Sequence, residues 1–345
     1  MAIFDLDARP GTKTHGLVKV GELAFGSPIT LPVMVLSGEG KGPLLWVCGN
    51  VHGDELNGPL AMMELYRELD PARIRGSLVL TPLLNAPAFM DRAKMASLDR
   101  LDMDTVFPGD PQGLQAERTA QVLFREITRH ADAVINLHSH NTRFEAIPYA
   151  NYKIVPGADP AVTRRSRDLA AAFGTRVICR IDLATADGEL PGVTRGALDI
   201  CCISRGIPAF MAELGAGGRA EPHNIALAKQ GLVNVMSLMG MCQGDRLVQA
   251  RQVVIQRRRF LRANRGGYLQ VLARLGEIHP RGVPYARLFN WWEDLDLPCL
   301  EREAYVIATR VNPLVATGEK MIMLGTEWTE EAARPEAWPQ AASPA

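Results

Sequence analysis

The sequence predicts an α/β fold in which a mixed, mostly parallel sheet carries helices on both faces and is followed by a small C-terminal all-β module. Two observations predict this fold. From residue 43 to about residue 255, short apolar runs alternate with amphipathic segments, an order that favours a parallel or mixed sheet covered on both faces. From residue 252 onward, short β-branched or aromatic runs are broken by Gly and Pro, a spacing typical of an all-β unit.

The predicted strands and helices alternate along the chain. The strands are short apolar runs, at residues 43–51, 77–85, 133–138 and 207–214. The helices have apolar residues at helical spacing or an amphipathic composition, and cover residues 55–69, 117–130, 161–173 and 224–241. We therefore expect a large domain over residues 1–250, a β-rich module over 251–327 and a disordered tail over 328–345, where Ala, Pro and Glu are frequent.

The composition is that of a soluble globular protein. The 345 residues include 38 Lys+Arg and 38 Asp+Glu, so the formal net charge is zero, while 47% are hydrophobic and 22% charged. A dedicated binder of nucleic acid or of a membrane surface would carry excess positive charge, so neither partner is expected. One basic run is expected to be a solvated linker or strand edge, and it consists of Arg257, Arg258, Arg259, Arg262 and Arg265.

Three features bear on the cellular location. The N-terminus has no basic region followed by an apolar core, and no apolar run is long enough to cross a bilayer. The six cysteines contain no Cys-x-x-Cys pair, and a reducing compartment would keep them as thiols. We expect a cytoplasmic protein.

The strongest chemical signal is the block Gly-Asn-Val-His-Gly-Asp-Glu at residues 49–55, between the first predicted strand and the next helix. In open α/β sheets, ligands bind in the crevice at this end of the strands. His52 and Glu55 are three residues apart across a tight turn, so an imidazole nitrogen and a carboxylate oxygen can bind one zinc ion. Asp54 is expected to face the helix N-terminus. The alternative is that His52 and Glu55 only cap the helix.

A catalytic zinc ion needs a third protein ligand and one position open to water. His138 ends the predicted strand 133–138, so we expect it at the same sheet edge as His52 and Glu55. His140 lies further into the loop and is expected behind a metal ligand, facing the substrate, or exposed. The remaining histidines are expected to be structural: His15, His130, His223 and His279.

Glu213 is the candidate general base. It ends the apolar run 207–214, where a carboxylate without a role is costly. Burial there would raise its pKa toward the range that a general base needs. The alternative is that Glu213 is paired with a nearby cation such as Arg219.

These blocks resemble the succinylglutamate desuccinylase/aspartoacylase family. The matching blocks are Gly-x-x-His-Gly-x-Glu at 49–55, Phe-Pro-Gly at 107–109, Leu-His-Ser at 137–139 and Glu-Leu-Gly at 213–215, and the resemblance runs from about residue 15 to residue 325. It implies a zinc carboxypeptidase-like fold with residues 1–250 as a zinc-hydrolase domain. It also implies one zinc ion per chain, bound by His52, Glu55 and His138, with Glu213 as the catalytic base.

The chain departs from the family pattern at the expected carboxylate clamp. Relatives often carry Asn-Arg before the Phe-Pro-Gly block, whereas this chain has Asp104 and Thr105. An Arg earlier in that loop corresponds to Lys94 here, with Arg92 close by. Asp104 would repel an anion, so we expect a substrate that presents an amine, a hydroxyl or a neutral amide there.

The predicted function is that of a zinc-dependent amidohydrolase, which removes an N-acyl group from an amino acid or a related small amine. Glu213 would take the proton of the attacking water, and Lys94 or Arg92 would assist the metal in stabilising the oxyanion. One alternative is a metallocarboxypeptidase that acts on peptides. Another is a non-catalytic binding protein that has kept the fold.

Several further residues are given roles at the edge of this site. Arg143 is expected either to reach the pocket mouth as a substrate-binding residue or to be exposed. Trp291 and Trp292, with Phe289, are expected in the core of the β module or at its seam with the large domain. That module is expected either to shape the pocket entrance or to form a subunit contact in a homo-oligomer.

Overall fold

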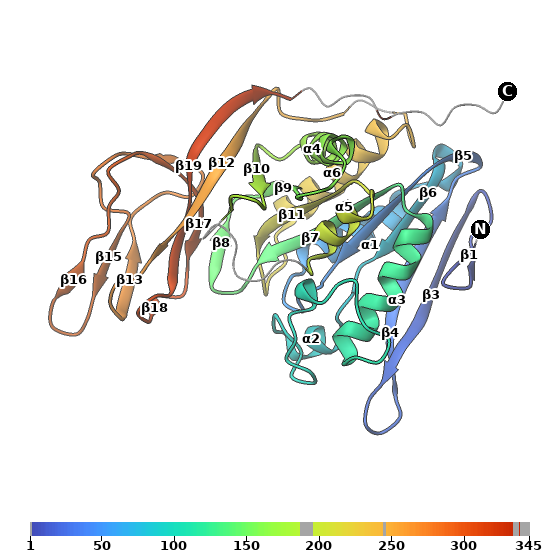
Figure 1. Ribbon diagram of the computed structural model, residues 1–345, viewed down its shortest axis with the longest axis horizontal. Coiled ribbons are helices and arrows are strands. Elements are labelled where there is room, and N and C mark those ends of the chain that lie inside the picture. The colour runs from blue at the N-terminus through green and yellow to red at the C-terminus, as the bar shows by residue number, and fades with distance from the viewer. Residues whose placement is uncertain (1, 187–195, 244–245, 334–337, 339–345) are drawn as a thin grey trace.

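The computed structural model describes residues 2–186, 196–243, 246–333 and residue 338. It has one 13-stranded sheet, a separate four-stranded sheet and a two-stranded N-terminal ribbon of β1 (Ala2–Ile3) and β2 (Leu6–Asp7). Figure 1 shows the helices gathered around one part of the large sheet, with the strands of the four-stranded sheet at the far left of the view. Within the described residues, no helix is both long and apolar enough to span a membrane.

The large sheet is mixed. In spatial order it consists of β14 (Ile278–His279), β17 (Ala304–Arg310), β19 (Lys320–Ala332), β12 (Arg251–Arg262), β10 (Val177–Asp182), β9 (Tyr149–Ile154), β11 (Ala209–Ala216), β7 (Ala133–His140), β5 (Gly40–Gly49), β6 (Arg75–Thr81), β4 (Pro28–Ser37) and β3 (Thr12–Glu22), with β8 (Phe144–Ala146) paired to β17. Parallel pairing is confined to β6–β5–β7–β11 and to β9–β10–β12. The prediction of a mostly parallel sheet therefore holds for these central strands and is wrong for the whole sheet.

The helices cover both faces of the sheet, as predicted. One face packs against α1 (Asn57–Glu68), α4 (Pro160–Phe173) and α6 (Pro222–Leu238), and the other packs against α3 (Gln115–His130) and α5 (Leu198–Ser204). A short helix, α2 (Ala86–Asp91), and two 3-10 turns, Pro71–Arg73 and Met103–Thr105, lie in the connections. The apolar strands β5, β6 and β7 are buried on both sides because each face has its own helical layer.

The C-terminal region is rich in strands, in agreement with its broken apolar pattern. Its four-stranded sheet has the order β16 (Asp294–Asp296), β15 (Ala286–Phe289), β13 (Gly267–Val271) and β18 (Leu314–Val315). The longer strands β12 and β19 instead belong to the large sheet, because β12 pairs in parallel with β10 and antiparallel with β19. The large sheet therefore continues from the helix-covered region into the C-terminal strands.

Three expectations about this region need correction. The segment 328–332 is not a disordered tail, because it forms the end of β19 and pairs with β12, where Trp328 lies opposite Ile255; residues 334–337 and 339–345 lie outside the described residues. Arg258 is not solvated but only 8% exposed. Trp291 and Trp292 are 77% and 89% exposed, so they belong to no core or seam.

Five strands of the large sheet outside the C-terminal region were not predicted: β3, β4, β8, β9 and β10. β3 and β4 form an N-terminal antiparallel hairpin, and β9 and β10 pair in parallel on either side of α4. In β3, half-buried and exposed residues alternate, so the strand has no continuous apolar run. Half-buried residues on one face and exposed residues on the other are typical of a strand at the edge of a sheet.

The start of α1 packs directly on β7. A β-carbon at Gly58 would lie 2.6 Å from the Leu137 β-carbon, a separation that no real contact allows. Only glycine lets the helix approach the strand so closely. This contact holds the loop with His52 and Glu55, which precedes α1, close to His138, which follows Leu137.

We predict that Gly58→Ala lowers the free energy of unfolding by about 1 to 3 kcal/mol, because the added methyl overpacks the contact between α1 and β7. Chemical denaturation measures this loss. Arg67→Ala, at an exposed position of the same helix, should change the stability by less than about 0.5 kcal/mol. Equal stability of Gly58→Ala and the wild type would contradict the packing argument.

Candidate metal centre and surrounding pocket

The candidate residues lie at the carboxyl ends of three neighbouring strands. His52 and Glu55 follow β5, His138 lies near the end of β7, and Glu213 lies opposite His138 in the register of β11 and β7. These strands run parallel, so their carboxyl ends meet at one edge of the sheet. The structure therefore brings together four residues from three segments that lie far apart in the sequence.

The loop from residue 50 to residue 56 is held by its own backbone and by α2. Asn50 adopts a left-handed conformation with φ of 55°, and its side-chain amide donates to the backbone oxygens of Glu55 at 2.9 Å and Gly53 at 3.3 Å. A β-carbon at Gly53 would lie 2.0 Å from the backbone of Ala88, so the close approach of α2 requires glycine there. These contacts fix the direction in which the Glu55 side chain leaves the loop.

The alternative in which these residues only cap a helix is wrong. The helix α1 begins at Asn57, and its N-cap residue Leu56 makes no capping bond through its side chain. No capping bond places Asp54 at the helix N-terminus as predicted; its side chain is buried, and its Oδ1 has no hydrogen-bond partner among the described residues. Burial and the neighbouring carboxylate of Glu55 raise the pKa of Asp54.

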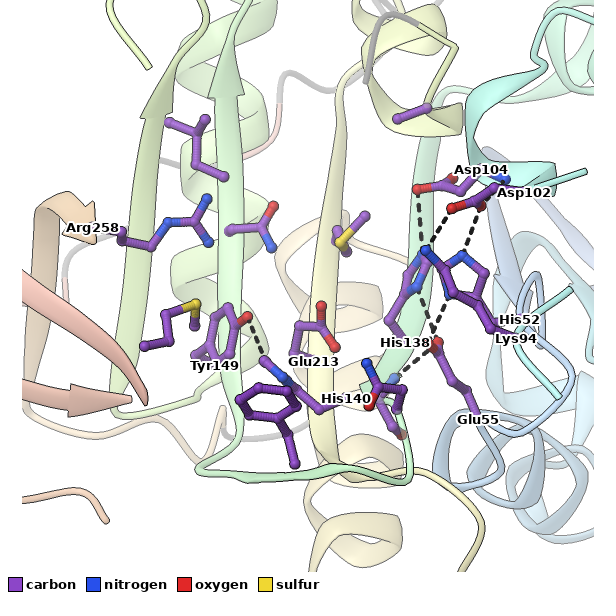
Figure 2. Close-up of a pocket in the computed structure, with 18 of the residues that line it drawn as sticks. His52, Glu55, Lys94, Asp102, Asp104, His138, His140, Tyr149, Glu213 and Arg258 are labelled. Atoms are coloured by element: carbon purple, nitrogen blue, oxygen red, sulfur yellow. Dashed lines mark hydrogen bonds and ion pairs between the residues drawn. The ribbon is translucent and has the colours of Figure 1, made fainter. Parts of the chain in front are cut away.

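One carboxylate joins the two imidazoles. The Oε1 atom of Glu55 lies 2.7 Å from Nδ1 of His52, and its Oε2 atom lies 3.0 Å from Nδ1 of His138 (Figure 2). Each residue offers a ligand atom, and these atoms all lie within 4.8 Å of one another. The three side chains are buried, with exposed fractions below 10%.

The electrostatics of this cluster favour a positive charge at its centre. Burial disfavours the charged imidazole of His52, but the carboxylates of Glu55 and Asp102 outweigh it and raise the His52 pKa to about 10. The pKa of His138 is also raised against burial, chiefly by Glu55. Burial would raise the pKa of Glu55, yet the two imidazoles lower it well below its usual range. Two nitrogens and two carboxylate oxygens around one point form a donor set that fits a divalent metal ion.

Asp102, which was not predicted as a site residue, contacts this cluster at the second ring nitrogen of His52. Its Oδ1 lies 2.9 Å from Nε2 of His52, and its Oδ2 accepts a hydrogen bond from Lys94 Nζ at 2.5 Å. Burial opposes ionisation of Asp102, but His52 and Lys94 hold its pKa well below the usual range. A carboxylate on the second nitrogen of a metal-binding histidine fixes the tautomer and orientation of the ring.

Asp104 and Thr105 both line the pocket, as the substrate prediction requires. The Oδ1 atom of Asp104 accepts from the Asn136 side chain and from the backbone N–H of Leu198, both at 3.3 Å. Its Oδ2 lies 3.9 Å from Nε2 of His138. Burial raises the Asp104 pKa. Thr105 donates its hydroxyl to the backbone oxygen of Asp102 at 2.7 Å, so of the two residues only Asp104 offers a carboxylate to the pocket.

Glu213 lines the same pocket beside His138. Its Oε2 atom is buried and has no hydrogen-bond partner among the described residues. The alternative partner Arg219 instead bonds to Glu145 at 3.0 Å and to Glu221 at 2.9 Å, so the predicted pairing with Glu213 is wrong. A carboxylate oxygen is therefore available next to the His-Glu-His cluster.

His140 faces the pocket through a contact that sequence reasoning did not foresee. Its Nε2 lies 3.0 Å from the hydroxyl oxygen of Tyr149, a residue of β9 that also lines the pocket. Tyr149 lies opposite Glu213 in the register of β9 and β11, and burial together with the Glu213 charge raises the Tyr149 pKa well above its usual value. The two rings form the wall next to Glu213 (Figure 2).

The two predicted arginines lie outside the pocket lining. Arg92 is an exposed residue in a left-handed conformation at the end of α2. Arg143 is exposed, and its Nη1 donates to Oε1 of Glu319 at 3.4 Å. Lys94 does line the pocket, so it is the predicted cation that the structure places near the cluster.

The pocket has a volume of about 520 Å³, which suits a small-molecule ligand. Its wall extends beyond the strands of the cluster to the C-terminal strands. β12 contributes Arg258 and Phe260, and β19 contributes Lys320 and Met323. The C-terminal strands therefore complete the cavity, which agrees with the predicted role of this region at the pocket entrance.

Comparison with known proteins gives one family match. Residues 41–239 match the family described as the succinylglutamate desuccinylase/aspartoacylase catalytic domain. A related protein, the N-alpha-acetyl-L-2,4-diaminobutyric acid deacetylase of Halomonas elongata, is 26% identical over 322 residues, which cover 90% of each chain.

Solved structures share the fold over nearly the whole chain. A succinylglutamate desuccinylase from Silicibacter sp. TM1040 superposes with a TM-score of 0.82 at 23% identity, covering 92% of this chain and 95% of that chain. The product-bound ectoine utilization protein EutE (DoeB) from Ruegeria pomeroyi superposes with a TM-score of 0.81 at 23% identity, covering 92% and 96%.

We predict that Asp102→Asn weakens zinc binding by about 10- to 100-fold, because the His52 ring loses the carboxylate that orients it. Competition with a chromophoric chelator measures the dissociation constant. Asp110→Asn, at an exposed position of the same connection, is the control and should bind zinc as the wild type does. An unchanged zinc affinity in Asp102→Asn would show that the contact with His52 has no role in metal binding.

Proposed function

Because the chain belongs to the succinylglutamate desuccinylase/aspartoacylase family, we propose that it is a zinc-dependent hydrolase that removes an N-acyl group from an amino acid or a related small amine. One observation carries the proposal: the ligand atoms of His52, Glu55 and His138 converge beside the Glu213 carboxylate in one pocket. The test is release of free amine from N-acyl amino acids by the purified, zinc-loaded protein.

We assign the metal to His52, Glu55 and His138. The fit rests on the two Nδ1 atoms that face the two Glu55 oxygens, and on the negative charges of Glu55 and Asp102, which favour a cation at this point. A zinc ion held there would lower the pKa of a water molecule and polarise the acyl carbonyl.

Glu213 is assigned as the general base. Its buried Oε2 has no partner among the described residues and faces the same cavity, so it can accept the proton of the attacking water. As the C–N bond breaks, the same oxygen returns that proton to the departing amine. This cycle leaves Glu213 ionised again after each turnover.

Lys94, and not Arg92, is assigned to the developing oxyanion. Lys94 lines the pocket, and its position is held by Asp102, which also holds His52. A cation that is already oriented stabilises charge in the transition state without reorganisation.

The substrate that we propose is an N-acetylated diamino acid. Asp104 places a carboxylate where relatives often have a carboxylate clamp, so a positively charged amine is the complementary group. The named substrate of the Halomonas elongata relative has one acetylated amine and one free amine, which supports this choice. Binding of an ammonium group would also favour the ionised form of the buried Asp104.

We propose a zinc carboxypeptidase-like domain over residues 1–250 and a β-rich module over residues 251–327. The helical layers on both faces of the sheet support the first part, and the separate four-stranded sheet supports the second. A homo-oligomer stays a prediction, which a measurement of the molecular mass in solution would test.

We expect Glu213→Gln to lower kcat by about 100- to 10,000-fold, because the glutamine side chain cannot accept the proton of the water. The zinc content should equal that of the wild type, since Glu213 is no metal ligand in this scheme. Elemental analysis and amine release are the two measurements. Glu145→Gln, on the adjacent β8 and outside the pocket lining, is the matched control. A fully active Glu213→Gln enzyme would exclude this base.

Substrate choice tests the role of Asp104. The wild type should hydrolyse N-α-acetyl-L-2,4-diaminobutyrate with a higher kcat/KM than N-acetyl-L-glutamate, and Asp104→Asn should reduce that ratio by about tenfold or more, because one charge pair is lost. Asp110→Asn again serves as the control. A wild-type preference for the acidic substrate would show that Asp104 does not select for an amine.

A further inference from the structure

The C-terminal strands place two basic side chains in the pocket wall. Arg258 belongs to β12 and Lys320 is the first residue of β19; both line the pocket together with Phe260 and Met323. Neighbouring residues on these strands point the other way, since Leu261 and Ile322 belong to a separate hydrophobic core. Figure 2 shows Arg258 across the cavity from His52 and His138, with Tyr149 and Glu213 between them.

Lys320 is a half-buried cation among other cations. Within the described part of the chain no carboxylate forms an ion pair with it, and its Nζ lies 4.1 Å from the centre of the Phe260 ring. Burial lowers the Lys320 pKa, and the positive charges of Arg262, Lys94 and Arg258 lower it further. An anion bound near Lys320 would remove this repulsion.

Arg258 is a buried cation in the wall of the pocket. It is only 8% exposed although it carries a permanent charge, and it forms part of the wall of a cavity that is open to ligands. A guanidinium group offers a planar fork of donors that matches a carboxylate. Its strand is fixed in the sheet by pairing with β19, so its position does not depend on a mobile loop.

The pocket therefore has opposite charges on two sides. Asp102 and Asp104 line it near the His-Glu-His cluster, whereas Arg258 and Lys320 line it on the C-terminal strands. Lys94 and Lys153 also line the pocket, but each already contacts a carboxylate, Lys94 that of Asp102 at 2.5 Å and Lys153 that of Asp199 at 2.6 Å. A ligand with an amine and a carboxylate would satisfy both sides.

We propose that Arg258 and Lys320 form a carboxylate-binding subsite for the substrate. The inference rests on the proposed deacylase function, and it assigns to the C-terminal strands the recognition of an acid group. That carboxylate belongs either to the amino-acid half or to the acyl half of the substrate. The two sources have the same chemistry at the subsite, and they differ in which substrates need the two cations.

Three substrates separate these sources. N-α-acetyl-L-2,4-diaminobutyrate has its carboxylate on the amine half, N-succinyl-1,3-diaminopropane has one on the acyl half, and N-acetyl-1,3-diaminopropane has none. Lys320→Met should lower kcat/KM by roughly 10- to 100-fold for the substrate whose carboxylate it binds, mainly through KM, and far less for N-acetyl-1,3-diaminopropane. Arg258→Lys, which keeps the charge but loses the fork, should act on the same substrate.

Arg262→Met is the matched control. Arg262 lies opposite Lys320 in the register of β12 and β19 and contributes to the same positive field, but it is exposed and outside the pocket lining. Its loss should change all three kcat/KM values by less than about threefold. If Lys320→Met lowers all three values equally, or none of them, the subsite is wrong.

Direct binding keeps the test independent of turnover. Isothermal titration calorimetry should detect L-2,4-diaminobutyrate or succinate in the wild type, with affinity lost by roughly 10- to 100-fold in Lys320→Met and retained in Arg262→Met. If the wild type hydrolyses none of the three substrates, the deacylase proposal fails while a Lys320-dependent binding signal still supports the subsite. Equal binding by the wild type and Lys320→Met, or no binding by either, overturns it.

Discussion

The Glu55 carboxylate is the contact on which the rest of the site depends. Its two oxygens face the Nδ1 atoms of His52 and His138, and these residues come from different strands of the sheet. Without it, the two protonated imidazoles would repel each other, and an isolated buried carboxylate would be costly. Asp102 extends the same contact to Lys94, so the charges of the loop, the strand and the connection after α2 balance one another.

The sequence predicts those parts of the site that short local patterns encode. The block 49–55 follows a buried strand, and His138 and Glu213 each stand at the end of an apolar run, so their meeting at one sheet edge follows from parallel pairing. The helices α1, α3, α4 and α6 were equally predictable because they have apolar residues at helical spacing or an amphipathic composition, whereas the short helices α2 and α5 were not predicted. The strand β3 has a one-sided pattern and was missed.

The remaining parts of the pocket depend on tertiary contacts that no local pattern contains. No local pattern distinguishes Asp102 from its neighbours in the sequence. Its role depends on its contact with the ring of His52, which lies 50 positions away in the chain. The arginine run suggested a solvated segment, because nothing in its composition shows that β12 pairs with β10 and β19 and turns Arg258 into a cavity. Tyr149 lies in a strand that was not predicted, although its hydroxyl contacts the predicted loop residue His140.

Because β19 is the last strand in the chain, the parts of the pocket are synthesised on the ribosome in a fixed order. The candidate ligands and Glu213 all precede α6 in the chain. The opposite wall of the cavity is complete only after β19, which begins at Lys320, has been synthesised. A nascent chain that has emerged only through α6 already contains His52, Glu55 and His138, but it still lacks the pocket residues of β12 and β19. The proposed metal ligands are therefore synthesised before the residues proposed to recognise the substrate carboxylate.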